Sequence, residues 1–256
     1  MTRRRASAAR AVLVTAGARR IGRAIALEFA RRGWDVAVHY GTSRRQALAT
    51  AREIESLGRR AVVLGRDLAV EHGTRKLVPD AIAALGRLDC VVNNASLFDY
   101  DDAAHFRGAT LIRHLRVNTV APVLLAQALH EALAPPARGV VINLLDQKLW
   151  NPNPDFFSYT LSKSALKEAT TLLALALAPR VRVVGVAPGM TLPSHLQDAA
   201  AFDRTHRMAP LGRASTPEDV ASAVVFAADA QAMTGTTLLV DGGQHLQRTD
   251  RDFSFL

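Results

Sequence analysis

The 256-residue sequence has a formal charge of +9 and is 49% hydrophobic, which predicts a globular protein with a substantial core. It has no apolar run near the roughly 20 residues of a membrane span, and no signal-peptide core follows the basic residues 1–10. The charge is mostly scattered arginine without zinc-finger spacing or interleaved aromatic residues, so we expect neither nucleic-acid binding nor a metal site. The single cysteine, Cys90, cannot form an internal disulfide, which favours a cytoplasmic location.

Short apolar runs alternate with longer amphipathic segments along the chain. The predicted strands are 11–15, 35–40, 60–65, 88–93, 140–145, 181–187 and 237–241. The predicted helices are 20–32, 44–57, 74–85, 111–133, 159–178 and 217–228, the last beginning at the cap sequence Thr216-Pro217-Glu218-Asp219. The strands are rich in Val, Leu and Ile, as in a parallel sheet buried on both faces. We therefore predict a flexible basic tail (1–9) and one α/β domain (10–256), a doubly wound Rossmann-like fold with a seven-stranded parallel sheet flanked by helices.

Two segments, 97–108 and 188–210, interrupt the alternation with polar, aromatic or proline-rich sequence. Each follows the carboxyl end of a predicted strand, which is the edge where open α/β sheets bind ligands. Long loops in a compact domain are usually functional, so we expect the site to lie between these two.

A tight turn of small residues, 15–22 (TAGARRIG), joins the first strand to the first helix. Such a turn directs backbone N–H groups and a helix N-terminus at a pyrophosphate. Arg20 stands where the usual fingerprint has glycine, and its guanidinium suits phosphate oxygens. After the second strand, residues 39–45 (HYGTSRR) lack the acid that binds the ribose hydroxyl in NAD sites. Hydroxyls and arginines there predict NADP(H), the alternative being that these residues only cap the next helix.

Tyr159 and Lys163 are four residues apart at the start of a predicted helix. This spacing puts both on one face, about 6 Å apart along the axis. An ammonium group near a phenol lowers the phenol pKa from about 10. The pair is therefore predicted to exchange a proton with a substrate near neutral pH.

Several further motifs accompany this pair: residues 93–95 (NNA), Asn118, residues 188–189 (PG) and residues 241–243 (DGG). Together with the Tyr-x-x-x-Lys spacing, the set resembles the short-chain dehydrogenase/reductase family over about residues 11–246. The resemblance implies that Tyr159 donates the proton, Lys163 binds the nicotinamide ribose and supports Tyr159, and Asn118 orders a water relay. It also implies that the end of the fourth strand supports the cofactor and that the protein is a homotetramer.

One position departs from the family pattern. The usual serine, about thirteen residues before the tyrosine, is replaced by Asp146. A serine donates to a carbonyl oxygen, whereas an ionised aspartate only accepts. Asp146 therefore suits a substrate with N–H donors, or a site that delivers a proton to nitrogen. The alternatives are an inactive member of the family, or a structural ion pair of Asp146 with Lys148 or an arginine.

With this aspartate, the chain resembles the pteridine reductase branch of the family. The arginine-containing turn, residues 39–43, residues 94–98 (NASLF) and the Asp146–Tyr159 pair carry the resemblance. Residues 241–246 (DGGQHL) are similar to bacterial dihydromonapterin reductases. The branch implies that Phe98 sandwiches a flat pterin against the nicotinamide and that Ser96 and Arg20 bind the pterin near the cofactor phosphates. Ala16 and Thr42 depart from the branch pattern, which leaves the exact phosphate contacts open.

We therefore expect an NADPH-dependent reductase that converts a dihydropterin to its tetrahydro form. The alternatives are a carbonyl reductase of the 3-oxoacyl thioester type and a non-catalytic NADP(H)-sensing protein. The expected catalytic residues are Asp146, Tyr159, Lys163 and Asn118, and the expected substrate-binding residues are Arg20, Ser96, Phe98, Asp146 and Tyr159. The expected cofactor-binding residues are Gly17, Arg20, Ile21, His39, Tyr40, Ser43, Asp67, Leu68, Asn93, Ala95, Ser96, Lys163, Pro188, Gly189 and Thr191. No role is predicted for residues 247–256, although Phe253 and Phe255 are suited to packing on a neighbouring subunit.

Overall fold

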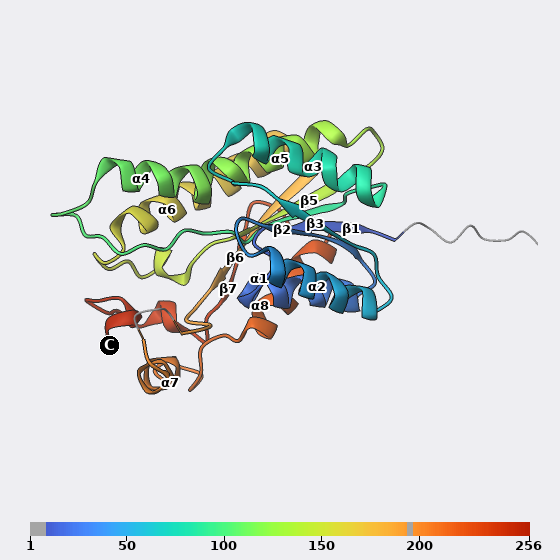
Figure 1. The fold of residues 1–256 in the computed structure, drawn as a ribbon. Coiled ribbons are helices and arrows are strands. Elements are labelled where there is room, and N and C mark those ends of the chain that lie inside the picture. Colours follow the sequence, from blue (N-terminus) through green and yellow to red (C-terminus); the bar gives the residue numbers. More distant parts are fainter. Residues whose placement is uncertain (1–8, 194–196) are drawn as a thin grey trace, which may run out of the picture.

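A parallel sheet forms the centre of the protein (Figure 1). The computed structural model describes residues 9–193 and 197–256, so the predicted basic tail lies outside the described residues except for its last one. The described residues form a seven-stranded parallel sheet, as predicted, and its strand order is β3-β2-β1-β4-β5-β6-β7. The strands are β1 (Ala11–Val14), β2 (Asp35–Tyr40), β3 (Ala61–Gly65), β4 (Cys90–Asn93), β5 (Gly139–Leu144), β6 (Val181–Pro188) and β7 (Thr237–Val240).

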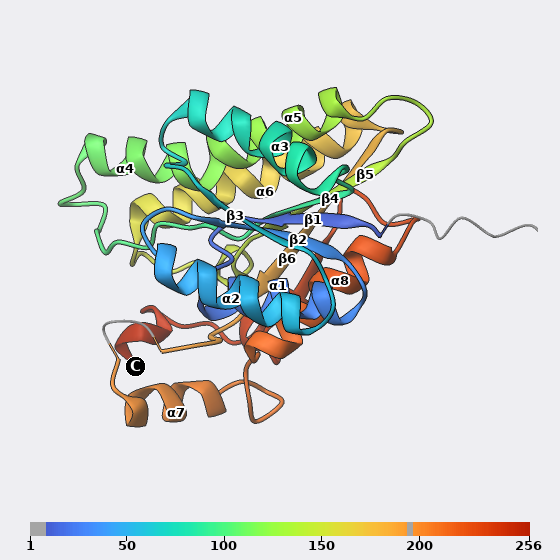
Figure 2. The ribbon, with the colours of Figure 1, turned by 45° about the vertical axis from the view of Figure 1, so that its right-hand side comes forward.

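Helices cover both faces of the sheet (Figures 1 and 2). One face carries α1 (Arg20–Arg31), α2 (Arg44–Ser56) and α8 (Pro217–Asp229), and the other carries α3 (Glu71–Leu85), α5 (Ala121–Ala132) and α6 (Phe157–Leu177). The short helix α4 (Gly108–Leu115) precedes α5, and α7 (Ala199–Arg207) lies apart from the sheet, beside the C-terminal residues. Among the described residues, no helix is long and apolar enough to cross a membrane, and no His, Cys, Asp or Glu cluster suits a metal ion.

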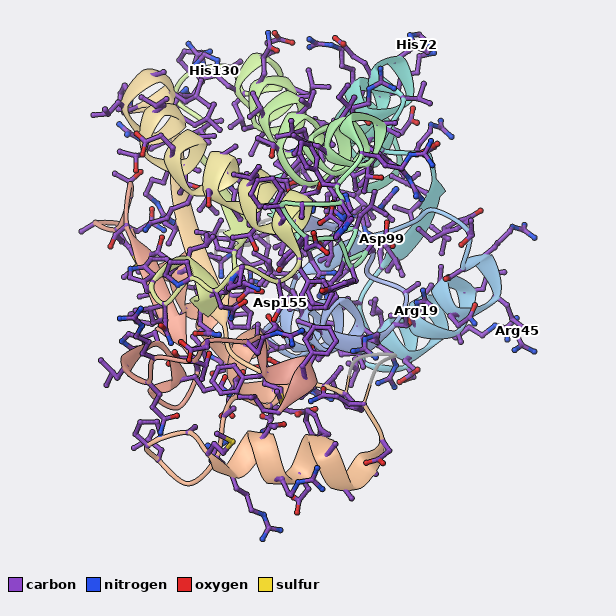
Figure 3. The ribbon with its side chains drawn as sticks, turned by 90° about the vertical axis from the view of Figure 1, so that its left-hand side faces the viewer. Arg19, Arg45, His72, Asp99, His130 and Asp155 are labelled. Carbon is purple, nitrogen blue, oxygen red and sulfur yellow. The ribbon has the colours of Figure 1, made fainter. Side chains whose placement is uncertain are left out.

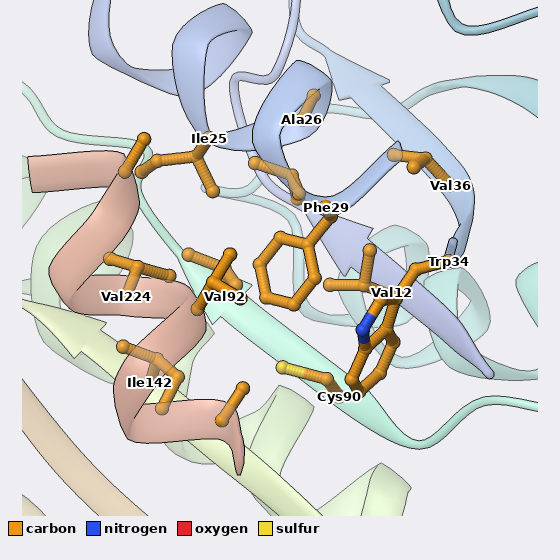
Figure 4. Packing of buried hydrophobic residues seen from close by; sticks show 14 of the residues in the cluster. Val12, Ile25, Ala26, Phe29, Trp34, Val36, Cys90, Val92, Ile142 and Val224 are labelled. Carbon is orange, nitrogen blue, oxygen red and sulfur yellow. The ribbon is translucent and has the colours of Figure 1, made fainter. Parts of the chain in front are cut away.

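The core under α1 and α8 shows why the strands are almost continuously apolar in sequence (Figure 4). Val12, on β1, faces this layer, whereas the next residue, Leu13, packs in the layer under α3 and α5. Phe29 and Trp34 meet edge to face, with ring centroids 5.1 Å apart, over the β1 and β4 side chains. Fully burying one such large side chain contributes about 1.5–3 kcal/mol, so both layers hold the strands in place.

The helix predicted at 111–133 is interrupted by a π-helical turn, Arg116–Val120, between α4 and α5. Asn118 lies in this turn and is fully buried. Its side-chain amide donates to the Leu97 carbonyl (3.0 Å) and to Ser162 Oγ (2.9 Å), and its Oδ1 accepts from the Leu97 N–H (2.8 Å). The one-residue bulge turns this amide toward the loop after β4, and such bulges are frequent at functional sites.

Other boundaries differ from the sequence prediction in ways that matter locally. Helix α3 begins at Glu71 rather than at Thr74, and it continues through Pro79. Helix α6 begins at Phe157, two residues before Tyr159. The segment predicted as irregular, 188–210, contains α7, which Asp198 caps by accepting from the Ala201 N–H (2.7 Å).

Helix α8 begins with a reciprocal capping box. The Asp219 N–H donates to Thr216 Oγ1 (3.1 Å), and the Thr216 N–H donates to Asp219 Oδ2 (2.9 Å). We predict that Thr216→Ala lowers the free energy of unfolding by about 1 kcal/mol, because an N-terminal N–H of the helix loses its acceptor. Urea denaturation followed by circular dichroism measures this, with Thr216→Ser as the control that keeps the hydroxyl. Equal stability of the alanine variant and wild type would contradict the prediction.

Candidate active site

A cleft of about 590 Å³ opens at the carboxyl ends of the strands, where the strand order reverses between β1 and β4. Figure 3 faces this edge of the sheet. The cleft is lined by several of the predicted site residues: Arg20, Ile21, Ser96, Phe98, Asp146, Tyr159, Lys163, Pro188, Gly189 and Thr191. Both long loops contribute to it, as the sequence predicts, so the predicted catalytic and substrate-binding groups are largely brought together.

The turn after β1 has a glycine-like backbone at two positions that hold other residues. Ala16 has a φ of 49° and Arg20 a φ of 53°, both in the left-handed region that glycine adopts most easily. Gly22 has no room for a side chain, since a Cβ there would lie 2.2 Å from the Ala16 carbonyl oxygen and 2.5 Å from Asn94 Nδ2. The Arg20 guanidinium donates to the Pro193 carbonyl (3.0 Å), so it links this turn to the loop after β6.

His39 supports this turn from β2. Its buried ring accepts from the Ala16 N–H at Nδ1 (3.1 Å), and its Nε2 lies 3.0 Å from the Arg66 carbonyl oxygen. Its own carbonyl accepts from the Gly17 N–H (3.0 Å). Burial lowers the pKa of His39 to about 4, so the imidazole is neutral, with its proton on Nε2. His39 thus holds the turn through Nδ1 and its carbonyl, while Nε2 ties the ring to the segment after β3, and a contribution to cofactor binding would come through the shape of the turn.

The other residues predicted for the adenosine end lie near the ends of β2 and β3. Tyr40 packs against Gly65, where a Cβ would approach the phenol ring within 2.6 Å. Ser43 precedes α2, and its side chain makes no capping hydrogen bond among the described residues, which argues against a purely capping role. Asp67 accepts from the Ala69 N–H (2.9 Å), and Leu68 is buried in the core. Their contacts with a nucleotide stay predictions.

Hydrogen bonds join the end of β4 to the turn after β1. Thr15 Oγ1 accepts from the N–H groups of Asn94 (2.9 Å) and Ala95 (3.0 Å), and it donates to the Val92 carbonyl (3.2 Å). Asn93 lies one residue deeper, where its amide donates to Asn143 on β5 (2.8 Å). Asn93 is therefore part of the support beneath the cleft, not of its lining.

Tyr159 and Asp146 meet directly in the cleft. The Tyr159 hydroxyl donates to Asp146 Oδ2 (2.6 Å), and the Lys148 N–H donates to Asp146 Oδ1 (2.8 Å). The Lys148 ammonium instead contacts Asp155 and Asp252, so Asp146 is not bound in the structural ion pair that was one alternative. The carboxylate therefore reaches the phenol with both of its oxygens already oriented.

Burial and the contact between Asp146 and Tyr159 shift the pKa values of both groups. Burial raises the pKa of the Asp146 carboxyl against the lowering effect of its two hydrogen bonds. Burial and the neighbouring Asp146 charge raise the pKa of Tyr159 well above its usual value. Lys163 donates its ammonium proton to the Leu144 carbonyl (2.7 Å), and burial lowers its own pKa to about 8. The expectation that Lys163 lowers the Tyr159 pKa is therefore wrong for this structure, because burial and the adjacent carboxylate both raise the pKa and keep the phenol protonated.

Phe98 lies beside the phenol. Its ring stacks on Phe156, with centroids 4.1 Å apart, and meets Tyr159 edge to face at 4.7 Å. Ser96 lines the same cleft and donates to the Leu97 carbonyl (3.2 Å). An aromatic surface thus stands next to the acid pair, as the sequence predicts.

The comparisons with known proteins agree with this geometry. A family model described as enoyl-(acyl carrier protein) reductase matches residues 15–245. An uncharacterized oxidoreductase of Mycobacterium tuberculosis, MT0954, is 36% identical over 248 residues and is covered to 90%, as is this chain. The chain belongs to the short-chain dehydrogenase/reductase family.

Solved structures of this family superpose closely on the chain. FolM alternative dihydrofolate reductase 1 from Brucella canis, complexed with NADP, has a TM-score of 0.90 and 42% identity, covering 94% of this chain and 96% of that one. The protein of the same name from Brucella suis, also complexed with NADP, has a TM-score of 0.87 and 42% identity, covering 93% and 96%. As a member of this family the chain is an oxidoreductase, and the non-catalytic alternative is set aside.

Sequence reasoning missed a group of residues that line the cleft from distant parts of the chain: Gln147, Met190, Leu192, Gln197, Asp252, Phe253 and Ser254. The sequence suggested that Phe253 and Phe255 pack on a neighbouring subunit. In the structure, Phe253 is buried within its own chain and Phe255 contacts Phe156. Aromatic residues near a chain end carry no local signal for where they pack. Only the folded arrangement of the loops places them here.

The protonation of Tyr159 can be tested without a substrate. We predict that Asp146→Asn shifts the ionisation of Tyr159 to lower pH, because the variant removes the negative charge and the carboxylate acceptor that oppose phenolate. A pH titration of tyrosinate absorbance measures the shift, and Tyr159→Phe identifies which transition belongs to this residue. Asp99→Asn, at an exposed aspartate paired with Arg113, is the matched control. An unchanged titration in Asp146→Asn would contradict the prediction.

Proposed function

We propose that the protein is an NADPH-dependent reductase that transfers hydride to a C=N bond of a dihydropterin, which yields the tetrahydropterin. The observation that carries the proposal is the 2.6 Å hydrogen bond between Tyr159 and Asp146 in a cleft lined by Phe98. A carboxylate at the family's serine position cannot donate to a carbonyl oxygen, whereas it accepts from N–H groups. A pterin ring presents such groups along one edge.

The fit to NADP(H) rests on the turn after β1 and on the residues after β2. The turn offers backbone N–H groups at the start of α1, and Gly22 leaves no Cβ where the backbone of this turn packs tightly. No acid follows β2, and Ser43, Arg44 and Arg45 offer hydroxyl and guanidinium donors for a 2′-phosphate. The two similar structures named above were solved with NADP. NADPH, when bound, supplies the hydride.

The side chains of this chain supply the proton and the alignment. Tyr159 Oη carries a proton that the raised phenol pKa retains at neutral pH, so the hydroxyl is a proton donor to a substrate nitrogen. Asp146 accepts the hydroxyl hydrogen in the resting state, and the proton that Tyr159 gives to the substrate is replaced from solvent. The Lys163 ammonium lies 5.9 Å from the Tyr159 ring and stabilises the transient phenolate. The proposed water relay through Asn118 would then connect Lys163 to solvent.

Substrate orientation is assigned to three groups. Phe98 provides an aromatic face beside Tyr159, and aromatic stacking contributes about 0.5–1.5 kcal/mol beyond burial. Ser96 and Arg20 line the same cleft and offer hydrogen-bond donors to ring oxygen and nitrogen atoms. The ring would lie between Phe98 and the nicotinamide.

The rival activity is reduction of a carbonyl in a 3-oxoacyl thioester, an acyl-chain chemistry like that in the description of the matching family model. Asp146 distinguishes pterin reduction from carbonyl reduction. A carbonyl substrate would place its oxygen toward the carboxylate, where two acceptors repel and neither shares a proton.

We also propose a homotetramer, as the family resemblance implies. Large apolar side chains are exposed on the outer helices, including Leu172 and Leu175 on α6 and Phe226 on α8. Such faces are suited to pairing with copies of themselves across two-fold axes.

Nucleotide binding should depend on Gly22. We predict that Gly22→Ala weakens NADPH binding at least about tenfold, or about 1.4 kcal/mol, because the new Cβ forces the Ala16 carbonyl and the turn apart. Quenching of intrinsic fluorescence on titration with NADPH measures the dissociation constant. Gly108→Ala, at a position where a Cβ meets nothing within 4 Å, is the control. Equal affinities in the two variants would count against the assigned turn.

The substrate assignment is tested by NADPH oxidation with dihydrobiopterin or dihydromonapterin. We expect turnover by the wild type and a loss of at least about 100-fold in kcat/KM in Asp146→Ser, since the proton-delivering pair is broken. A 3-oxoacyl thioester serves as the competing substrate, which Asp146→Ser should leave unchanged or improve. Absence of turnover with both pterins would refute the pterin assignment and leave the membership of the reductase family intact.

A further inference from the structure

Residues 251–256 lie against the substrate side of the cleft. Three of them, Asp252, Phe253 and Ser254, line it together with Asp146 and Tyr159. Figures 1 and 2 both show this end of the chain beside α7. The arrangement is held by contacts from three other parts of the chain.

The first attachment is Lys148, two residues after Asp146. Its ammonium is buried, with the side chain only 3% exposed, and it donates to Asp252 Oδ2 (3.0 Å) and to the Asp155 carbonyl (2.6 Å). Its backbone N–H donates to Asp146 Oδ1 (2.8 Å). One residue therefore holds both the carboxylate of the acid pair and the segment opposite it.

The second attachment is Asp155. Its Oδ2 accepts from Arg251 Nε (2.8 Å) and from the Asp252 N–H (2.8 Å). Gln197 adds a third link, because its amide donates to the Phe253 carbonyl (3.0 Å). Polar contacts at three consecutive residues fix this segment in place, so it is an ordered part of the site.

The fourth attachment is a stack of aromatic rings. Phe255 stacks on Phe156, with centroids 5.8 Å apart, and Phe156 is fully buried and stacks in turn on Phe98. Tyr100 meets Phe156 and Phe255 edge to face, each at 5.3 Å. The rings run from residue 255 to Phe98, which touches the edge of Tyr159.

We propose that residues 251–256 form the substrate-side wall of this chain's own cleft and that Lys148 is a positioning residue that couples the wall to Asp146. The proposal rests on the proposed function, because the wall selects what reaches the Asp146–Tyr159 pair. The wall presents a carboxylate and an aromatic ring, which suit a flat heterocycle with N–H donors. Its removal would open the cleft beside the acid pair to water.

The wall is tested by a chain that stops after Asp250 and, separately, by Phe255→Ala and Lys148→Met. We expect KM for the dihydropterin to rise at least about tenfold in the shortened chain, while the NADPH dissociation constant changes less than about twofold. Lys148→Met should also lower kcat, since residue 148, whose backbone N–H orients the Asp146 carboxylate, loses the side-chain contacts that hold it in place. Leu246→Ala, at a side chain that is 73% exposed and outside the wall, is the matched control. A shortened chain with wild-type KM and kcat would overturn the proposal.

Two further measurements distinguish a positioning role of Lys148 and Asp252 from a general loss of folding or activity. If the shortened chain does not fold, the comparison of Asp252→Asn with Asp252→Ala tests whether Asp252 anchors the wall to Lys148. The asparagine amide keeps an acceptor for Lys148, whereas alanine does not. We expect asparagine to retain most of the substrate affinity that alanine loses, and equal losses would overturn the assigned anchor. Titration of Tyr159 in Lys148→Met needs no substrate. Removal of the ammonium leaves the Asp252 charge uncompensated, which opposes phenolate, so a shift to higher pH supports the coupling even if the wild type fails with pterins. A transition that is unchanged or moves to lower pH refutes it.

Whether the wall acts within one chain is tested by co-expressing the shortened chain with the full-length Asp146→Asn variant. If each wall serves its own cleft, no subunit in the mixture has a complete site, and activity stays at the sum of the two variants alone. Activity clearly above that sum would show that the segment serves a neighbouring subunit, which would overturn the proposal.

Discussion

The chemistry of the cleft depends on one hydrogen bond, from the phenol of Tyr159 to the carboxylate of Asp146. The two groups come from different elements, the segment after β5 and the first turn of α6, so the sheet and the helix must both be in place before they meet. Because two acids in contact share a proton more readily than either releases it, the phenol stays protonated beside a buried carboxylate. Tyr159 and Asp146 therefore share one proton, and the surrounding contacts hold the two side chains at hydrogen-bonding distance.

The cleft also concentrates the unusual backbone of the chain. Among the described residues, the non-glycine positions with positive φ are Ala16, Arg20 and Phe156. Two lie in the turn after β1, and the third precedes α6 and is the middle ring of the aromatic stack. Each such conformation costs about 1–3 kcal/mol, and it persists only where the neighbours fix it. At Arg20 the neighbour is the Pro193 carbonyl, and at Phe156 it is the pair of rings above and below.

Much of the fold and part of the site could be predicted from the sequence, because both leave local signals. Apolar runs of strand length between amphipathic segments predicted every strand of the sheet, and the spacing of Tyr159 and Lys163 predicted that they share a helical face. The π-helical turn at Asn118 left no such signal, since one extra residue hardly alters the apolar pattern. The Tyr159 pKa was predicted with the wrong sign, because the helical spacing shows the nearby lysine but not the burial of the phenol, which is the largest cause of the raised pKa. Residues 251–256 could not be placed at all, since Lys148 and Asp252 are 104 residues apart in sequence.

The neutral imidazole of His39, beneath the turn after β1, makes the stability of the fold depend on pH. His39 accepts the Ala16 N–H with a lone pair that protonation would remove, and its pKa in the folded chain is about 4. In the unfolded chain the same ring takes up a proton near pH 6.5. Folding therefore becomes less favourable as the pH falls from about 6.5 toward 4, while the ring itself stays unprotonated. Over this range the turn keeps its shape as the surrounding fold loses stability, so mild acid would weaken the fold before it altered the turn after β1.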